Sequence, residues 1–311
     1  MLQAKWGVRK DVGVWFAPHS FFIEDRETVI LAGNRDDFLR LQAFYPLLYR
    51  MDTMGFQCVQ LSKTFFSQRG RVNALKSVNF DVKDQEFLCI VGPSGCGKTT
   101  LLKLIAGLIK PTSGQILFSN DPSNGQPRTA MVFQDQALFP WMNVLDNVAF
   151  GLEMQGIDRK ERRSQAYDLL KKVGLDGFYY SYPHELSGGM RQRVAILRAF
   201  LANPLILLMD EPFGALDSQT RLVMQEELLR IWKDHRKTII YVTHDIEEAI
   251  LLGDRILVMS GRPTSIRQEI IVPLERPRQL MIRDHPEVIE IRWHIWKMLE
   301  DEVRKELRIQ V

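Results

Sequence analysis

A glycine-rich segment in the first third of the chain constrains the fold more than any other feature. It reads Gly92-Pro93-Ser94-Gly95-Cys96-Gly97-Lys98-Thr99, and Thr100 follows it. An apolar run at residues 87–91 comes before the segment, and a helical pattern at residues 98–109 comes after it. In a strand, glycine loop and helix of this order, backbone amides and the positive end of the helix can hold phosphate groups. We therefore expect an α/β fold that binds a nucleoside triphosphate.

The chemistry of this loop assigns separate tasks to its residues. The glycines allow successive backbone N–H groups to point inward toward a phosphate. The Lys98 ammonium can reach the β- and γ-phosphate oxygens, and the Thr99 hydroxyl can ligate Mg²⁺. The residues expected to bind the nucleotide here are Gly92, Pro93, Ser94, Gly95, Cys96, Gly97, Lys98, Thr99 and Thr100.

Two carboxylates follow a second apolar run. Residues 205–209 are Leu-Ile-Leu-Leu-Met, and Asp210 and Glu211 come directly after them. Ligands of open α/β sheets bind at the carboxyl ends of the strands. We expect Asp210 to bind Mg²⁺ and Glu211 to polarise the attacking water. The alternative is that these acids only cap the next helix.

The rest of the chain alternates short apolar runs with helical patterns. Further buried strands are expected at residues 130–133, 239–242 and 256–259, because a sheet covered on both faces needs continuous apolar strands. Between them, helical segments such as residues 159–173 indicate a helical insertion. The net charge of +3 is too small to indicate nucleic-acid binding by itself, and no apolar run is long enough to cross a bilayer.

The two ends of the chain carry no recognisable chemistry. Residues 1–54 form an aromatic-rich N-terminal extension of unknown role, with a possible amphipathic helix at residues 36–49. The native chain could begin at Met51 or Met54. In a C-terminal helical tail at residues 276–311, a helix is expected at 286–307. We expect that helix to pack on its own domain, and binding to a partner is the alternative.

A third motif, together with the order of the others, resembles ATP-binding cassette (ABC) ATPases. The segment Leu186-Ser187-Gly188-Gly189-Met190-Arg191-Gln192-Arg193 is similar to the signature sequence of that family. Gln134 matches the Q-loop, Gly214-Ala215-Leu216-Asp217 the D-loop, and Tyr241-Val242-Thr243-His244-Asp245 the switch-histidine segment. Phe65 stands where the family places an aromatic under the adenine, and Phe66 could replace it.

This resemblance covers residues 55–275 and implies the fold of the domain. The implied architecture is a P-loop NTPase of the ABC ATPase type, with a mixed sheet core and a helical subdomain at about residues 135–190. The implied cofactors are ATP and Mg²⁺.

The resemblance also implies roles for individual residues. Ser187, Gly188 and Gly189 would present a helix N-terminus to the γ-phosphate of ATP on a second cassette, so that two ATP molecules lie between two chains. His244 would orient the water polarised by Glu211, and Gln134 would contact Mg²⁺ or water. Asp217 would act in catalysis. Ser187 and Asp217 could instead be plain N-caps of the helices that follow them.

Further stretches resemble the importer ATPases for nitrate, sulfonates and taurine. The clearest is Gln134-Asp135-Gln136-Ala137-Leu138-Phe139-Pro140-Trp141. The implied protein is a peripheral energy-coupling subunit at the cytoplasmic face of the plasma membrane. It would pair with a second ATPase subunit, dock on permease subunits fed by a solute-binding protein, and bind no nucleic acid. Phe139, Pro140 and Trp141 would contact the permease or would be ordinarily buried.

Other classes of protein remain as alternatives. A soluble ABC ATPase not coupled to transport would carry the same cassette motifs. A P-loop kinase or GTPase would leave the signature and switch-histidine segments unexplained.

Overall fold

The computed structural model describes residues 13–17, 20–25, 28–32, 54–67, 70–123, 125–135, 137–278 and 285–308. The chain divides into two compact units, Met1–Met54 and Gly55–Val311. The first unit contains an antiparallel sheet of β1 (Gly13–Ala17), β2 (Ser20–Asp25) and β3 (Thr28–Ala32). No strand is predicted there from the sequence, and the helix expected at residues 36–49 lies outside the described residues.

The second unit is built on a six-stranded sheet in the order β12-β11-β6-β10-β9-β8. Five of its strands are parallel, and β12 runs antiparallel to β11, so the sheet is mixed as expected. The strands are β6 (Phe87–Val91), β8 (Thr129–Val132), β9 (Ile206–Asp210), β10 (Thr238–Thr243), β11 (Arg255–Met259) and β12 (Ile266–Ile271). The apolar runs thus predicted all five parallel strands, although β8 ends one residue early, before the exposed Phe133.

Both faces of this sheet are covered, which explains why its strands are continuously apolar. Along β6, Phe87, Cys89 and Val91 belong to one hydrophobic cluster, and the alternate residues Leu88 and Ile90 belong to another. Successive side chains of a strand point to opposite faces, so each face has its own core. Helix α2 (Lys98–Ile105) and a second sheet, of order β5-β4-β7, cover the Leu88 face. The other helices cover the Phe87 face.

The second sheet is formed by strands that the sequence analysis did not predict. They are β4 (Met54–Ser67), β5 (Gly70–Lys83) and β7 (Ser113–Phe118). Buried and exposed residues are mixed along β5, so it has no apolar run to reveal it. The prediction for the adjoining helix was too long, because α2 ends at Ile105 and Gly107 has a left-handed φ of 72°.

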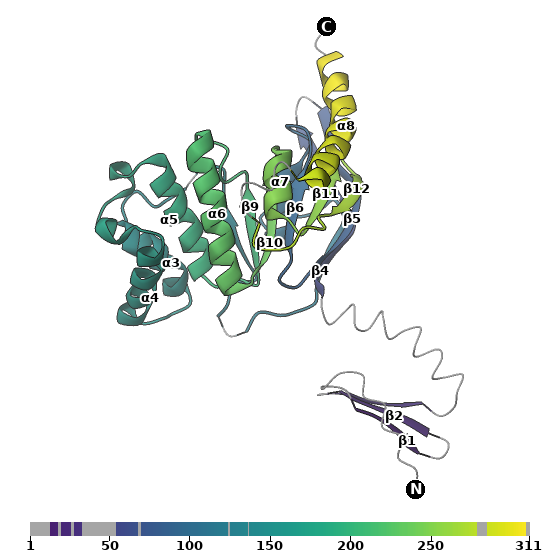
Figure 1. The fold of residues 1–311 in the computed structure, drawn as a ribbon, viewed down its shortest axis with the longest axis horizontal. Helices are drawn as coiled ribbons and strands as arrows, with labels where there is room; N and C mark the ends of the chain where they lie inside the picture. The colour runs from purple at the N-terminus through teal and green to yellow at the C-terminus, as the bar shows by residue number, and fades with distance from the viewer. Residues whose placement is uncertain are drawn as a thin grey trace. The chain divides into compact units, whose positions relative to one another are not determined.

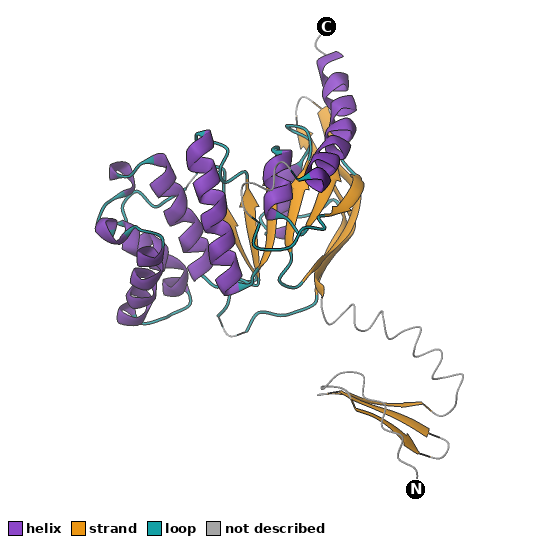
Figure 2. Cartoon of the chain, viewed as in Figure 1, coloured by secondary structure: helices purple, strands orange, loops and turns teal. Residues whose placement is uncertain are grey.

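Helices replace strands between β8 and β9. The main ones are α3 (Val144–Met154), α4 (Arg159–Lys172) and α5 (Gly188–Leu201), and each of the three contacts the other two. They gather on one side of the unit in Figure 1, and the same region is almost wholly helical in Figure 2. Buried Asn147 hydrogen-bonds the backbone N–H and carbonyl of Phe139 and so fixes the loop that enters α3.

The last three helices pack one after another on the Phe87 face. They are α6 (Ser218–His235), α7 (Ile246–Leu252) and α8 (Pro286–Arg308). Val288 and Ile295 of α8 are buried in the core of the unit, which confirms that this helix packs on its own domain. Across the described ranges of the chain, none of the helices is both long and apolar enough to span a bilayer.

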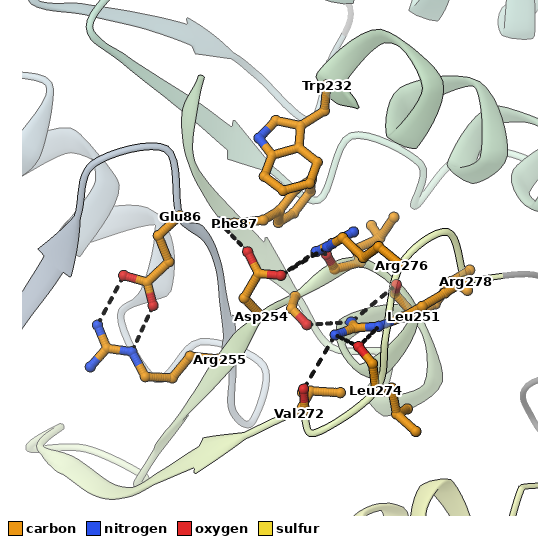
Figure 3. A network of polar contacts seen from close by, with 12 residues as sticks. Glu86, Phe87, Trp232, Leu251, Asp254, Arg255, Val272, Leu274, Arg276 and Arg278 are labelled. Carbon is orange, nitrogen blue, oxygen red and sulfur yellow. Dashed lines mark hydrogen bonds and ion pairs between the residues drawn. The ribbon is translucent and has the colours of Figure 1, made fainter. Parts of the chain in front are cut away.

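Arg278 joins the segment after β12 to the end of α7. Its guanidinium donates hydrogen bonds to the carbonyls of Ile250 and Gly253 at the end of α7. It also donates to the carbonyls of Val272 and Leu274, which are labelled in Figure 3. The last carbonyls of a helix have no partner within it, and a positive charge there also complements the helix dipole. Arg278 is 5 % exposed, so these are buried contacts.

Replacing Arg278 with Leu is expected to lower the free energy of unfolding by about 2–4 kcal/mol, because buried carbonyls lose a charged donor. Denaturant unfolding followed by circular dichroism measures the change. The control is Arg304→Leu, which removes an exposed arginine from α8. Equal midpoints for the two variants would contradict the structural role of Arg278.

Candidate functional site

Three neighbouring strands bring the predicted residues to one edge of the large sheet. Strand β10 lies between β6 and β9, and all three are parallel. The glycine-rich loop follows β6, Glu211 follows β9, and His244 follows β10. Since the carboxyl ends of parallel strands meet at one edge, residues far apart in sequence converge there.

The loop adopts a conformation that only glycine accommodates easily. Gly97, which precedes α2, has φ 126°, and a Cβ atom there would lie 3.3 Å from the Ala74 carbonyl oxygen. The loop is also held from outside, because Arg262 donates to the Gly95 carbonyl and Thr264 donates to the Cys96 carbonyl. These two contacts span 167 and 168 residues of sequence, and no local pattern indicates them.

Lys98 is buried at the base of the loop. Its ammonium donates to the carbonyls of Gly92 at 2.8 Å and Pro93 at 3.0 Å. The same nitrogen lies 3.9 Å from Oε1 of Glu211. The loop, the helix and the second carboxylate therefore meet at one positive charge.

Glu211 is held between Lys98 and His244. Its Oε2 lies 2.8 Å from Nδ1 of His244. Its backbone has φ 43°, the left-handed region that a non-glycine residue rarely adopts, and its N–H donates to the Val242 carbonyl at 2.9 Å. Such strain persists only where surrounding structure enforces it, and it is concentrated at functional sites.

Thr99 and Asp210 form an oxygen-rich pair beside this carboxylate. The Thr99 hydroxyl donates to Oδ1 of Asp210 at 3.1 Å, and Asp210 is 5 % exposed. Burial raises the pKa of Asp210, and the hydrogen bond from Thr99 opposes that shift. Hydroxyl and carboxylate oxygens are the ligands that Mg²⁺ prefers, so this pair fits the expected ion. Within the described parts of the chain, no group of three or more His, Cys, Asp or Glu residues is placed to hold a metal.

The signature segment and the D-loop residue lie at two neighbouring helix ends. Oγ of Ser187 accepts from Met190 N–H at 3.3 Å at the start of α5, and Asp217 accepts from Thr220 N–H at 3.0 Å at the start of α6. That hydrogen bond from Thr220 lowers the pKa of Asp217. A Cβ atom at Gly189 would lie 3.1 Å from Cγ2 of Thr220, so the two ends touch. Both residues are thus N-caps, whatever further role they have.

Gln134, Gly188 and the candidate adenine-binding residues lie outside the Lys98–Glu211–His244 group. Gln134 is exposed just beyond the end of β8, and Gly188 opens α5. Phe65 is 41 % exposed on β4, with the Lys63 ammonium 5.1 Å from its ring centroid, and Phe66 is 76 % exposed.

A buried carboxylate behind His244 was not predicted from the sequence. Glu248 accepts from the Thr243 hydroxyl and from Nε2 of Gln225 at 2.9 Å. Burial raises its pKa. Thr243 directly precedes His244 and Gln225 lies on α6, so Glu248 fixes the strand end that carries His244. A glutamate in the first turn of a helix ordinarily indicates only a solvated position, so the sequence gives no sign of this role.

Comparison with known proteins identifies relatives of the whole cassette. The sequence matches the ABC transporter family over residues 75–214. It is 49 % identical over 222 residues to the nitrate import ATP-binding protein of Synechocystis sp., a match that covers 71 % of this chain and 84 % of that protein. It is 51 % identical over 209 residues to the taurine import ATP-binding protein of Rhizobium johnstonii, covering 66 % and 79 % of the two chains.

The fold matches solved cassettes as well. One is the dimeric structure of a post-hydrolysis state of an ATP-binding cassette bound to ADP and Pi, with a TM-score of 0.62 and 34 % identity. That match covers 71 % of this chain and 100 % of the solved one. The architecture is therefore that of an ABC-type P-loop ATPase. By sequence, fold and the arrangement of its motifs, this chain belongs to the ABC transporter family as an ATP-binding subunit.

Proposed function

We propose that this chain hydrolyses ATP at the Lys98–Glu211–His244 site to drive import of a small anion or sulfonate through partner permease subunits. The observation that carries the catalytic part is the position of the Glu211 carboxylate, 2.8 Å from His244 and 3.9 Å from Lys98. A carboxylate held between a cation and an imidazole, at the mouth of a phosphate loop, can act on a water aimed at the γ-phosphate.

Each residue of the site then has a chemical task. Lys98 and the loop amides bind the phosphate oxygens, while Glu211 accepts a proton from water and His244 keeps that carboxylate oriented. Thr99, Asp210 and Gln134 would hold Mg²⁺, which when bound neutralises phosphate charge. Phe65 would lie against the adenine.

A second copy would complete the site. The N-terminus of α5, with Ser187, Gly188 and Gly189, offers backbone N–H groups to the γ-phosphate bound by a partner chain. The adjoining Asp217 would lie at the same interface. The related cassette bound to ADP and Pi is dimeric, which supports this arrangement.

The transport role rests on the relatives and on one surface. The two relatives act in the import of nitrate and of taurine, a sulfonate. Trp141 is 70 % exposed, and its ring centroid lies 5.5 Å from that of Phe139, which packs on Phe150 of α3. An exposed aromatic on a fixed base is suited to binding another protein. We assign it to the permease, which would place this subunit at the cytoplasmic face of the membrane and supply its solute from a binding protein.

The test is uptake by the cells that make this protein. Deleting its gene should abolish energised uptake of either labelled nitrate or labelled taurine, and the wild-type chain should restore it. Trp141→Ala should restore little uptake, although the purified variant still hydrolyses ATP. Trp296→Ala, at a tryptophan of α8 that is 44 % exposed, is the matched control and should restore uptake fully. Normal uptake of both solutes, and of a labelled aliphatic sulfonate, in the deletion strain would refute the import role.

A further inference from the structure

A cavity lies away from the nucleotide site, between the second half of α6 and the segment that follows β12. Its volume is about 380 Å³. This volume lies within the range of pockets that bind small molecules. The residues that line it are Glu226, Leu229, Arg230, Trp232, Lys233, Arg236, Arg276, Pro277 and Arg278. Trp232, Arg276 and Arg278 are drawn in Figure 3.

The lining is strongly cationic. It contains five basic side chains and one acidic side chain. Arg276 is paired with Asp254 at 2.8 Å, and Arg230 lies 3.8 Å from Glu227. Among the residues that the structure describes, the other three basic side chains, Lys233, Arg236 and Arg278, have no carboxylate within ion-pair distance.

The positive charges of these basic side chains repel one another. Burial, and next the charge of Arg276, lower the pKa of Arg278 to about 10. Like charges gathered around one concave site raise the local potential, and an anion in the cavity would relieve the repulsion. Lys233 and Arg236 are exposed at the rim, and the Lys233 side chain is free to turn toward a ligand.

The floor of the cavity is apolar and rigid. Trp232 is 2 % exposed, and its indole N–H donates to the Lys237 carbonyl at 2.6 Å. The guanidinium of Arg276 lies 4.4 Å from the ring centroid of Trp232, and that of Arg236 lies 5.0 Å from it. Cation–π contacts hold both guanidiniums in fixed positions against the ring.

We propose that this cavity binds a small organic anion, in which a sulfonate, carboxylate or phosphate ester group is attached to an apolar body. The charged group would pair with Lys233, Arg236 and Arg276, and the apolar body would lie on Leu229 and Pro277. None of the lining residues belongs to the nucleotide site. Because α6 has 18 residues and is about 27 Å long, the cavity and the Asp217 end of that helix are well separated.

The probe is 8-anilinonaphthalene-1-sulfonate, an aromatic sulfonate whose fluorescence rises on binding. It is titrated into the full chain with saturating Mg²⁺ and a non-hydrolysable ATP analogue, so that the nucleotide site is filled. The double variant Lys233→Gln/Arg236→Gln should bind the dye at least tenfold more weakly, since two charged contacts are lost. The control double variant Arg159→Gln/Lys160→Gln removes the same charge from exposed positions of α4 and should bind like wild type. Benzenesulfonate should displace the dye.

Equal dye affinity in the two double variants would overturn the proposal. It would also fail if the ATP analogue alone abolished dye binding, because the dye would then report the nucleotide site. A third arm uses vesicles of phosphatidylglycerol. Vesicle binding that depends on Lys233 and Arg236, without displacement of the dye by benzenesulfonate, would identify a lipid surface instead and refute a soluble ligand.

Discussion

Glu211→Gln is expected to lower the rate of ATP hydrolysis about 10²–10⁴-fold, as for the loss of a general base. The amide keeps the size of the side chain and a hydrogen bond to His244, which lies 2.8 Å from Oε2. It cannot accept a proton from the attacking water. Phosphate release with Mg²⁺ and ATP measures the rate. ATP binding should survive, because the loop and Lys98 are unchanged, and the ATP-bound variant should accumulate as a dimer in sedimentation experiments.

Two comparisons separate this effect from a general loss of structure. Glu161→Gln changes an exposed glutamate in the first turn of α4 and should leave hydrolysis unaltered. The thermal unfolding midpoint of Glu211→Gln should stay close to that of wild type, because the amide keeps the size of the side chain and Lys98 keeps its two carbonyl partners. Undiminished turnover in Glu211→Gln would assign the role of base to another residue.

The nucleotide site was largely predictable because its parts are local in sequence. The glycine loop stands between a strand and a helix within one short segment, and the Asp210–Glu211 pair directly follows a buried strand. Each pattern alone predicts that its residues lie at the end of a strand, and the rest of the fold is not needed for that prediction. The rule that parallel strands present their carboxyl ends together then predicts that Lys98, Glu211 and His244 meet.

The contacts that hold this site were not predictable, because they join segments distant in sequence. Arg262 and Thr264 hold the loop carbonyls from the turn between β11 and β12. Glu248 supports the end of β10 from inside α7. Strands β4 and β5 were missed because neither contains a continuous apolar run, although apolar and polar residues alternate over residues 78–83 of β5 and could have indicated a strand there. Such features depend on tertiary pairing, which a single sequence does not display.

Lys98→Ala is expected to weaken binding of ATP itself, by roughly 10- to 150-fold for each charged contact with a phosphate oxygen that is lost. The ammonium is 5 % exposed and lies within 3.0 Å of two loop carbonyls, so it is positioned before the ligand arrives. The loss should appear in the dissociation constant measured by calorimetry, whereas Glu211→Gln should change only the rate. The two variants therefore divide the site into a binding part and a reacting part.

The control for Lys98→Ala is Lys171→Ala, which removes an exposed lysine from the last turn of α4. It should bind ATP within about twofold of wild type, since a single exposed charge is worth well under 1 kcal/mol.

Because Lys98 also holds the carbonyls of Gly92 and Pro93, Lys98→Arg is the second variant: it keeps the charge and the donors in a larger head group. If weak binding came only from a collapsed loop, Lys98→Arg would restore the unfolding midpoint and the affinity together. A direct phosphate contact instead predicts a restored midpoint with affinity still reduced, because a guanidinium can donate to the loop carbonyls but does not place the compact charge of an ammonium against the phosphate oxygens. A normal dissociation constant in Lys98→Ala would exclude Lys98 from phosphate binding altogether.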